Sequence, residues 1–336
     1  MKKVVFAIAL FIITLEVLLR VVGVYNTPNE NNSGLYVNHY NTKMPTWFHH
    51  WTPNKTRQAH TTEFNYANQY NELGHRENSF ADFVEDTITK KVIFLGDSFT
   101  EGDGAPADST WVKRVEQLVR LNANKKLDFY NAGVCGSDVF FNNKMLEHKL
   151  IKANPNIVIE CVNSSDLMDV MWFGGNERFN IDGTTSGKVG PKWLIIYNYS
   201  HIVRAIIHTL FKFNNNLVKA DQLREQEIES AKLIEKQIEA TALFCKQKNI
   251  RYYLVIHPCP HEIGEDKSSI KVLNQYLANK PYTINLFGLL DSFYKTNNIK
   301  QFSHAINGHY NPKGYWVMGE KIYTELAKRD SLFANN

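Results

Sequence analysis

The chain has 336 residues, of which 43% are hydrophobic, and its 38 basic and 34 acidic residues leave a formal net charge of +4. This length allows one large domain with appendages or two small domains, and either arrangement can bury a proper core. The excess of positive charge is too small to predict a nucleic-acid-binding protein, so we expect no nucleic acid among its partners.

The N-terminus is an apolar stretch that runs from Val4 to Val24, preceded by two lysines and interrupted by Glu16 and Arg20. Its length matches a bilayer span, and the lysines favour an N-terminus left in the cytoplasm with the rest exported. Glu16 and Arg20 stand four residues apart and can pair, which reduces the cost of their charges near a membrane. We expect residues 1–25 to be an uncleaved anchor; a cleaved signal peptide and a soluble apolar helix are the alternatives.

Residues 26–66 are rich in Asn, Thr, His and aromatic residues and lack a helical period. This composition predicts a linker followed by extended pieces that pack on the main domain. The histidines in and just after this segment lack the paired spacing of a zinc site, so the sequence predicts no bound metal.

From Lys91 the chain alternates between apolar strands and amphipathic helices. Alternation of this kind predicts parallel strand pairing with right-handed crossovers, and therefore a three-layer α/β/α sandwich. We expect one helix to begin near Ser109, a second helix to end near Asn154 and a long third helix to cover 221–248. The expected strands are 91–97, 127–132, 157–162, 252–256 and 283–287.

One strand end carries a candidate nucleophile. The apolar strand at Val92–Leu95 runs directly into Gly96, Asp97 and Ser98, which places the serine at the carboxyl edge of the sheet, where α/β proteins bind ligands. An ordinary strand-to-helix turn is the alternative. A reactive serine also needs a general base and donors for an oxyanion. His309 is the candidate base, because the helix start predicted at Asn311-Pro312 holds it in a turn on the same edge.

Four blocks together resemble the GDSL/SGNH hydrolases, over about residues 67–328. They are Gly96-Asp97-Ser98, Asn131-Ala132-Gly133-Val134-Cys135-Gly136, Asn163-Ser164-Ser165-Asp166 and the segment around His309. The resemblance implies a flavodoxin-like SGNH domain, placed at 67–330, with Ser98 as nucleophile and His309 as general base. It further implies oxyanion donors at the amides of Ser98 and Gly136 and at a side chain of the third block. Asp97 and Asp166 would have supporting roles.

The chain departs from the family pattern in two places. Ser165, not Asn163, stands beside Asp166, so the third oxyanion donor is either Asn163 or the Ser165 hydroxyl. The acid that orients the family's histidine is replaced by Ile306. Asn307 could hold the ring through its carbonyl, although an amide cannot stabilise an imidazolium as a carboxylate does. A backbone carbonyl or a distant Asp is the other possibility.

Other reactive side chains fall at strand ends. His257 and His261 could contact substrate or replace His309, or they could belong to a loop stiffened by prolines. The four cysteines allow disulfides between Cys135 and Cys161 or between Cys245 and Cys259, and buried thiols are equally compatible with an exported protein.

An insertion at about 168–220 separates the third strand from the long helix. It is basic, aromatic and aliphatic, with no acidic residue from Gly183 to Lys219. Such a segment suits a lid, a membrane-surface contact or a partner-docking surface, and an ordinary helical excursion is the alternative.

The sequence therefore predicts an extracytoplasmic, membrane-anchored serine esterase or acyl-transfer enzyme without a cofactor. By analogy, the substrate is an O-acyl ester, with acetyl as the expected group, on an envelope carbohydrate or lipid. Water or a sugar hydroxyl would take the acyl group, and a membrane acyltransferase is a further possible partner. The alternative function is a weak or inactive, membrane-tethered binding or assembly protein with the same fold.

Overall fold

The computed structural model describes residues 2–24, 50–122, 127–181, 194–214, 217–219, 221–265 and 268–334. The chain divides into two compact units, which are described here separately. The helical unit comprises Met1–Asn38 and Lys188–Gln226, and the α/β unit comprises His39–Gly187 and Glu227–Asn336. The predicted linker up to residue 49, and the insertion from 182 to 193, lie outside the described residues.

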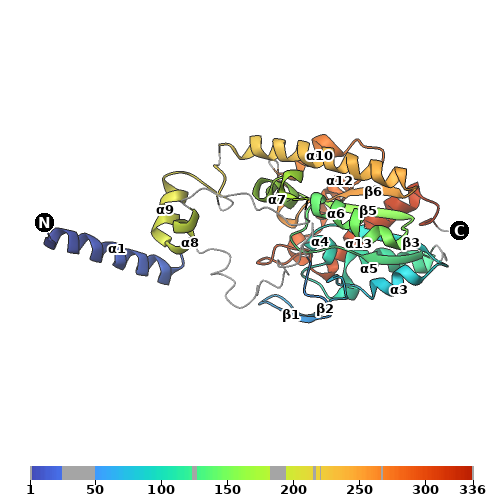
Figure 1. Ribbon diagram of the computed structural model, residues 1–336, viewed down its shortest axis with the longest axis horizontal. Helices are drawn as coiled ribbons and strands as arrows, with labels where there is room; N and C mark the ends of the chain where they lie inside the picture. The colour runs from blue at the N-terminus through green and yellow to red at the C-terminus, as the bar shows by residue number, and fades with distance from the viewer. Residues whose placement is uncertain are drawn as a thin grey trace. The chain divides into compact units, whose positions relative to one another are not determined.

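A five-stranded parallel sheet forms the centre of the α/β unit, in the order β4-β3-β5-β6-β7 (Figure 1). This is the flavodoxin-like order, so the predicted α/β fold is confirmed. The central strands are almost continuously apolar because helices cover both of their faces. Their bounds are β3 Lys90–Leu95, β4 Leu127–Asn131, β5 Ile157–Val162, β6 Arg251–Ile256 and β7 Thr283–Asn285.

Alternate side chains of the sheet build two separate cores. Ile93 and Leu95 of β3 point to one face, and Val92 and Phe94 point to the other. The first face is covered by α3 Phe80–Glu85, α6 Val139–His148, α7 Ser165–Phe173, α10 Leu223–Gln247 and α11 Ile270–Leu277. The second is covered by α5 Trp111–Asn122, α12 Phe287–Thr296 and α13 Pro312–Arg329.

The last strand is shorter than the sequence predicts. β7 ends at Asn285, whereas the apolar pattern extends to Phe287. The reason is local, because the Asn285 side-chain oxygen accepts a hydrogen bond from the Phe287 amide at 3.0 Å and α12 starts at that residue.

An N-terminal hairpin and the segment after it lie against the loop that follows β3. The antiparallel strands are β1 Thr56–His60 and β2 Asn65–Gln69. Beyond them, Arg76 donates to the carbonyl of Gly102 at 2.9 Å. Gly74 has a φ of +75°, and a Cβ there would lie 2.2 Å from the Trp51 carbonyl oxygen, so only glycine permits this approach.

The helical unit contains α1 Lys2–Val22, α8 Leu194–Tyr199 and α9 His201–Thr209, and α1 and α8 each contact α9 (Figure 1). Helix α1 is long and apolar enough to cross a membrane, and none of its residues is buried. By length and composition it fits a membrane anchor or a signal sequence.

Candidate active site

Ser98 is held by the turn at the end of β3. It is the first residue of α4 (Ser98–Glu101), and the Asp97 carboxylate caps this helix by accepting from the Phe99 amide at 2.9 Å. Gly96 has a φ of +153°, and a Cβ there would lie 2.2 Å from Thr100 Oγ1. The strand therefore turns sharply into α4, and Ser98 lies at the switch point between β3 and β5, where this fold binds ligands.

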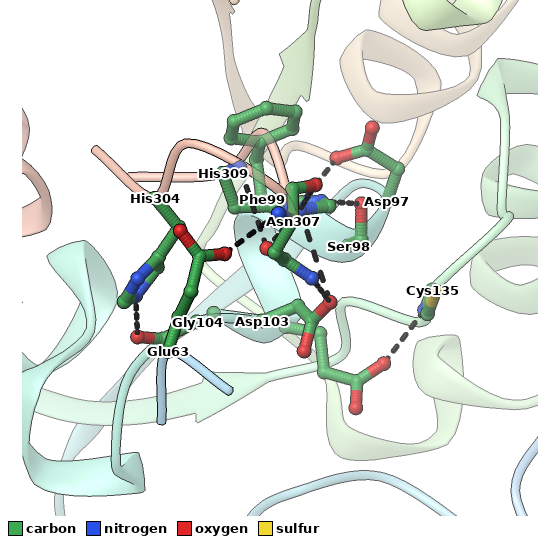
Figure 2. Close-up of polar contacts among 12 residues, drawn as sticks. Glu63, Asp97, Ser98, Phe99, Asp103, Gly104, Cys135, His304, Asn307 and His309 are labelled. Atoms are coloured by element: carbon green, nitrogen blue, oxygen red, sulfur yellow. Dashed lines mark hydrogen bonds and ion pairs between the residues drawn. The ribbon is translucent and has the colours of Figure 1, made fainter. Parts of the chain in front are cut away.

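His309 meets Ser98 directly. Ser98 Oγ lies 2.7 Å from His309 Nε2, and the Phe99 ring packs against the imidazole with centroids 4.5 Å apart (Figure 2). The histidine precedes α13, whose N-cap Asn311 accepts hydrogen bonds from the amides of Lys313 and Gly314. The sequence thus correctly located the helix start that positions this loop.

A relay to a carboxylate begins at the other nitrogen of the imidazole. His309 Nδ1 lies 2.8 Å from the side-chain oxygen Oδ1 of Asn307, and Asn307 Nδ2 donates to Asp103 Oδ2 at 3.2 Å (Figure 2). The same Asp103 oxygen lies 3.8 Å from His309 Nδ1. The carboxylate near the histidine therefore comes from the loop after Ser98, and Ile306, which stands where the resemblance expects an acid, is 79% exposed.

Asp103 is the distant Asp that the sequence left unidentified. It lies only five residues after Ser98, but it meets Asn307 across more than 200 positions of the chain. No spacing rule connects two such segments, and the sequence contains no other signal for this pairing. Asn307 contacts the imidazole chiefly through its side-chain oxygen and more distantly, at 3.3 Å, through its backbone carbonyl.

Glu63, in the turn between β1 and β2, fixes the loop that carries Asn307. Its carboxylate accepts hydrogen bonds from the amides of Ala305, Ile306 and Asn307 at 2.6, 3.0 and 2.8 Å. Burial opposes ionisation of Glu63, but these amide hydrogen bonds outweigh it and lower the pKa of the carboxyl below its ordinary value. No sequence pattern indicates chemistry in this segment, because the contact again links distant parts of the chain.

The segment Asn163–Asp166 forms hydrogen bonds that hold the Asp97 side chain. Asn163 Nδ2 and Ser165 Oγ both donate to Asp97 Oδ2, at 2.8 and 3.0 Å. Asp166 accepts from the Asn163 amide at 2.9 Å, and burial, followed by the nearby Asp97 charge, raises its pKa. Asn163 is 0% exposed, whereas Ser165 is partly exposed. Of the two candidate oxyanion donors, Ser165 is therefore the more exposed.

The glycine block lies beside α4. Gly136 is exposed, with a φ of +75°, in the turn after β4. The amide of its neighbour Cys135 donates to Glu101 at 2.6 Å, which ties this turn to the end of α4. Among the described residues, Gly136 forms no hydrogen bond to Ser98 or His309, and its backbone amide stays a predicted donor.

Of the two other histidines predicted at strand ends, His261 is exposed and His257 is fully buried. Burial lowers the pKa of His257, and its ring packs on Phe99. All four cysteines are free thiols, and Cys161, Cys245 and Cys259 are buried. The described part of the chain contains no cluster of three side chains suited to a metal ion.

No protein-family model and no curated protein matches this chain. Among solved structures it is similar to TesA, with a TM-score of 0.43 and 11% identity over 70% of this chain and 98% of that one. The acetylxylan esterase Axe2 from Geobacillus stearothermophilus gives a TM-score of 0.45 and 14% identity over 72% of this chain and 96% of that one. The lipase Lip_vut3 from a goat rumen metagenome gives a TM-score of 0.45 and 14% identity over 70% and 97%. At these values, the activity has to be argued from the site itself.

Proposed function

We propose that this protein is a serine esterase of the GDSL/SGNH type. The observation that carries the proposal is the 2.7 Å contact between Ser98 Oγ and His309 Nε2, with Nδ1 of the same ring held by Asn307. A serine is a weak nucleophile unless a base accepts its proton, and a base acts best when its second nitrogen is fixed. These contacts satisfy both conditions.

In the proposed reaction, Ser98 Oγ attacks the ester carbonyl while His309 Nε2 takes the hydroxyl proton. The Nδ1–H then donates to Asn307, and the Asp103 carboxylate stabilises the imidazolium through Asn307 and across 3.8 Å. His309 next gives its proton to the departing alkoxide, which leaves an acyl ester on Ser98. A water that His309 deprotonates attacks this ester, and His309 returns the proton to Ser98 Oγ as the acid leaves, which restores both residues.

Three groups are proposed to hold the oxyanion. The Ser98 amide stands at the first position of α4, where helix amides have no intrahelical acceptor. The Gly136 amide is the second donor. The Ser165 hydroxyl would be the third, after rotating from Asp97, because Asn163 is buried.

We propose an O-acetyl or other short acyl ester on an envelope carbohydrate or lipid as the substrate. The support is the apolar helix α1 with the two lysines at its start, which favours an anchored protein with the site outside the cytoplasm. If a sugar hydroxyl replaces water in the second step, the same residues catalyse acyl transfer.

A second candidate function is an inactive binding or assembly protein, with a membrane acyltransferase as its proposed partner. The exposed Ile306 at the acid position favours it. Asp103 argues against it, because a carboxylate is present near His309 from another segment.

The test uses the full-length protein in detergent and follows p-nitrophenol release from acetyl and butyryl esters. We expect hydrolysis by the wild type, a loss of about 10⁴-fold in Ser98→Ala, and no loss in Ser109→Ala, a serine outside the site. Equal rates in wild type and Ser98→Ala would contradict the proposal. A folded wild type that is silent towards both esters would favour the binding protein.

A further inference from the structure

Helix α9 has an inverted distribution of side chains. It buries His201 and Arg204, which are 1% and 0% exposed, alongside Ile207. On its outer side Ile206 is 38% exposed, and Leu210, directly after the helix, is 72% exposed. In water the opposite order is favoured, because burying polar groups and exposing apolar ones both cost free energy. The arrangement fits apolar surroundings.

His201 and Arg204 of α9 each form hydrogen bonds within the helical unit. His201 Nδ1 donates to the carbonyl of Val24 at 2.8 Å. Arg204 Nη1 donates to the carbonyls of Tyr197 and Asn198 at 3.3 and 3.2 Å, which satisfies oxygens at the end of α8. His201 Nδ1 and Arg204 Nη1 thus have partners inside the protein, and polar groups in lipid need such partners because no water can supply them.

Glu16 of α1 joins the two helices. Its carboxylate accepts from Ser200 Oγ and from the amides of His201 and Ile202 at 2.8, 2.9 and 3.0 Å. A carboxylate at the N-terminus of a helix is also favoured by the helix dipole. Glu16 lies six residues before the end of α1, or roughly 9 Å along its axis. The start of α9 therefore lies at the same depth as Glu16, which is inside the predicted membrane span.

The segment of α8, α9 and the two residues after α9 exposes apolar side chains, as α1 does. Its exposed apolar side chains are Ile196, Tyr199, Ile206, Leu210 and Phe211, at 58, 78, 38, 72 and 56% exposure. From 194 to 219 the sequence has three basic residues and no acidic one. Amphipathic helices lie at a lipid surface with their apolar side chains in the acyl region. Arg204 is buried, so the basic side chains that remain for the headgroups are those of Lys212 and Lys219, which follow α9.

We propose that α8 and α9 are embedded with α1 in the outer interface of the membrane. The hydrogen bonds that Glu16 accepts from the start of α9 hold the two helices at this depth. The occupant of their apolar surface is lipid. Three helices rather than one then anchor the protein in the membrane, and the segment 194–211 is part of the anchor.

The experiment reconstitutes the full-length protein in liposomes and labels it with an apolar carbene reagent that partitions into the bilayer. Peptides are then mapped by mass spectrometry. We expect labelling in 2–22 and in 194–211, and none in α13. Labelling confined to 2–22 would overturn the proposal, because 194–211 would then face water or protein. The absence of label from both segments would overturn it as well.

Two variants test the role of Glu16 in the same liposomes. Glu16→Leu keeps α1 apolar but removes the acceptor for α9, so labelling of 194–211 should fall several-fold while that of 2–22 is kept. Thr14→Leu is the matched control, because Thr14 Oγ1 bonds the Leu10 carbonyl within α1. Undiminished labelling of 194–211 in Glu16→Leu would show that the Glu16 carboxylate does not hold α8 and α9 in the membrane.

Discussion

Ser98 and His309 meet at one hydrogen bond, but the parts of the chain that hold them differ in kind. Ser98 follows a buried strand, and its turn is fixed by close packing around Gly96. His309 lies in a loop tied by the carboxylates of Glu63 and Asp103, which come from two distant segments. The position of Ser98 therefore depends on the fold itself, whereas the position of His309 depends on a few polar contacts. We therefore expect substitutions around Ser98 to lower the stability of the fold and substitutions around His309 to lower kcat.

The largest effect is expected from His309→Ala. Without the base, Ser98 keeps its proton, so kcat for ester hydrolysis should fall by about 10³- to 10⁴-fold with little change in melting temperature. Steady-state kinetics and a thermal melt of the full-length protein measure both quantities. A fall below tenfold would mean that another group acts as the base.

Gly96→Ala tests the strand side. A Cβ there meets the Thr100 side chain at 2.2 Å and the Cys161 carbonyl at 3.1 Å, so we expect a loss of about 2–4 kcal/mol of unfolding free energy. Gly288→Ala is the control, because no atom lies within 4 Å of a Cβ at that position. Equal melting temperatures for the two variants would contradict the packing described around Gly96.

Asp103→Asn tests the relay. Asn307 still orients the ring, but no carboxylate stabilises the imidazolium, so kcat should fall by about 10- to 100-fold with KM nearly unchanged. The acidic limb of the pH–rate profile should also move towards lower pH, which a purely structural defect would not produce. Asp108→Asn provides a surface control. An unchanged pH profile in Asp103→Asn would remove Asp103 from the mechanism.

Glu63→Gln tests the tie on the loop of the histidine, and kcat should fall by about three- to tenfold because the imidazole is held less well. The pKa of Glu63 is lowered from 4.5, so its ionised form stabilises the loop fully above that pH, and this contribution is lost as pH falls below 4.5 through the lowered pKa. The wild type should lose more activity than the variant over that range. Parallel acid profiles would show that Glu63 does not fix the loop.

Ile306→Asp should have the smallest effect. Ile306 is 79% exposed, so a carboxylate there points to solvent, and kcat should stay within about twofold of the wild type. The same substitution should not rescue Asp103→Asn. Rescue would mean that a carboxylate at position 306 can reach His309, and that the hydrogen bonds of Glu63 do not fix the loop in the position described.

The same contrast explains what the sequence could predict. The five strands, Ser98 and the cap at Asn311 follow from local patterns, since apolar runs and capping residues act over a few neighbours. The limits expected for the domains stay a prediction. Asp103 and Glu63 were missed because their partners lie more than 200 residues away, and no periodicity records such a contact.

The central claim, a serine activated by His309, is tested most directly by labelling with a fluorophosphonate. The full-length wild type should carry one adduct on Ser98, identified by peptide mass spectrometry, and His309→Ala should carry almost none. A folded wild type that takes no adduct, or an adduct on Ser98 that is independent of His309, would contradict the account.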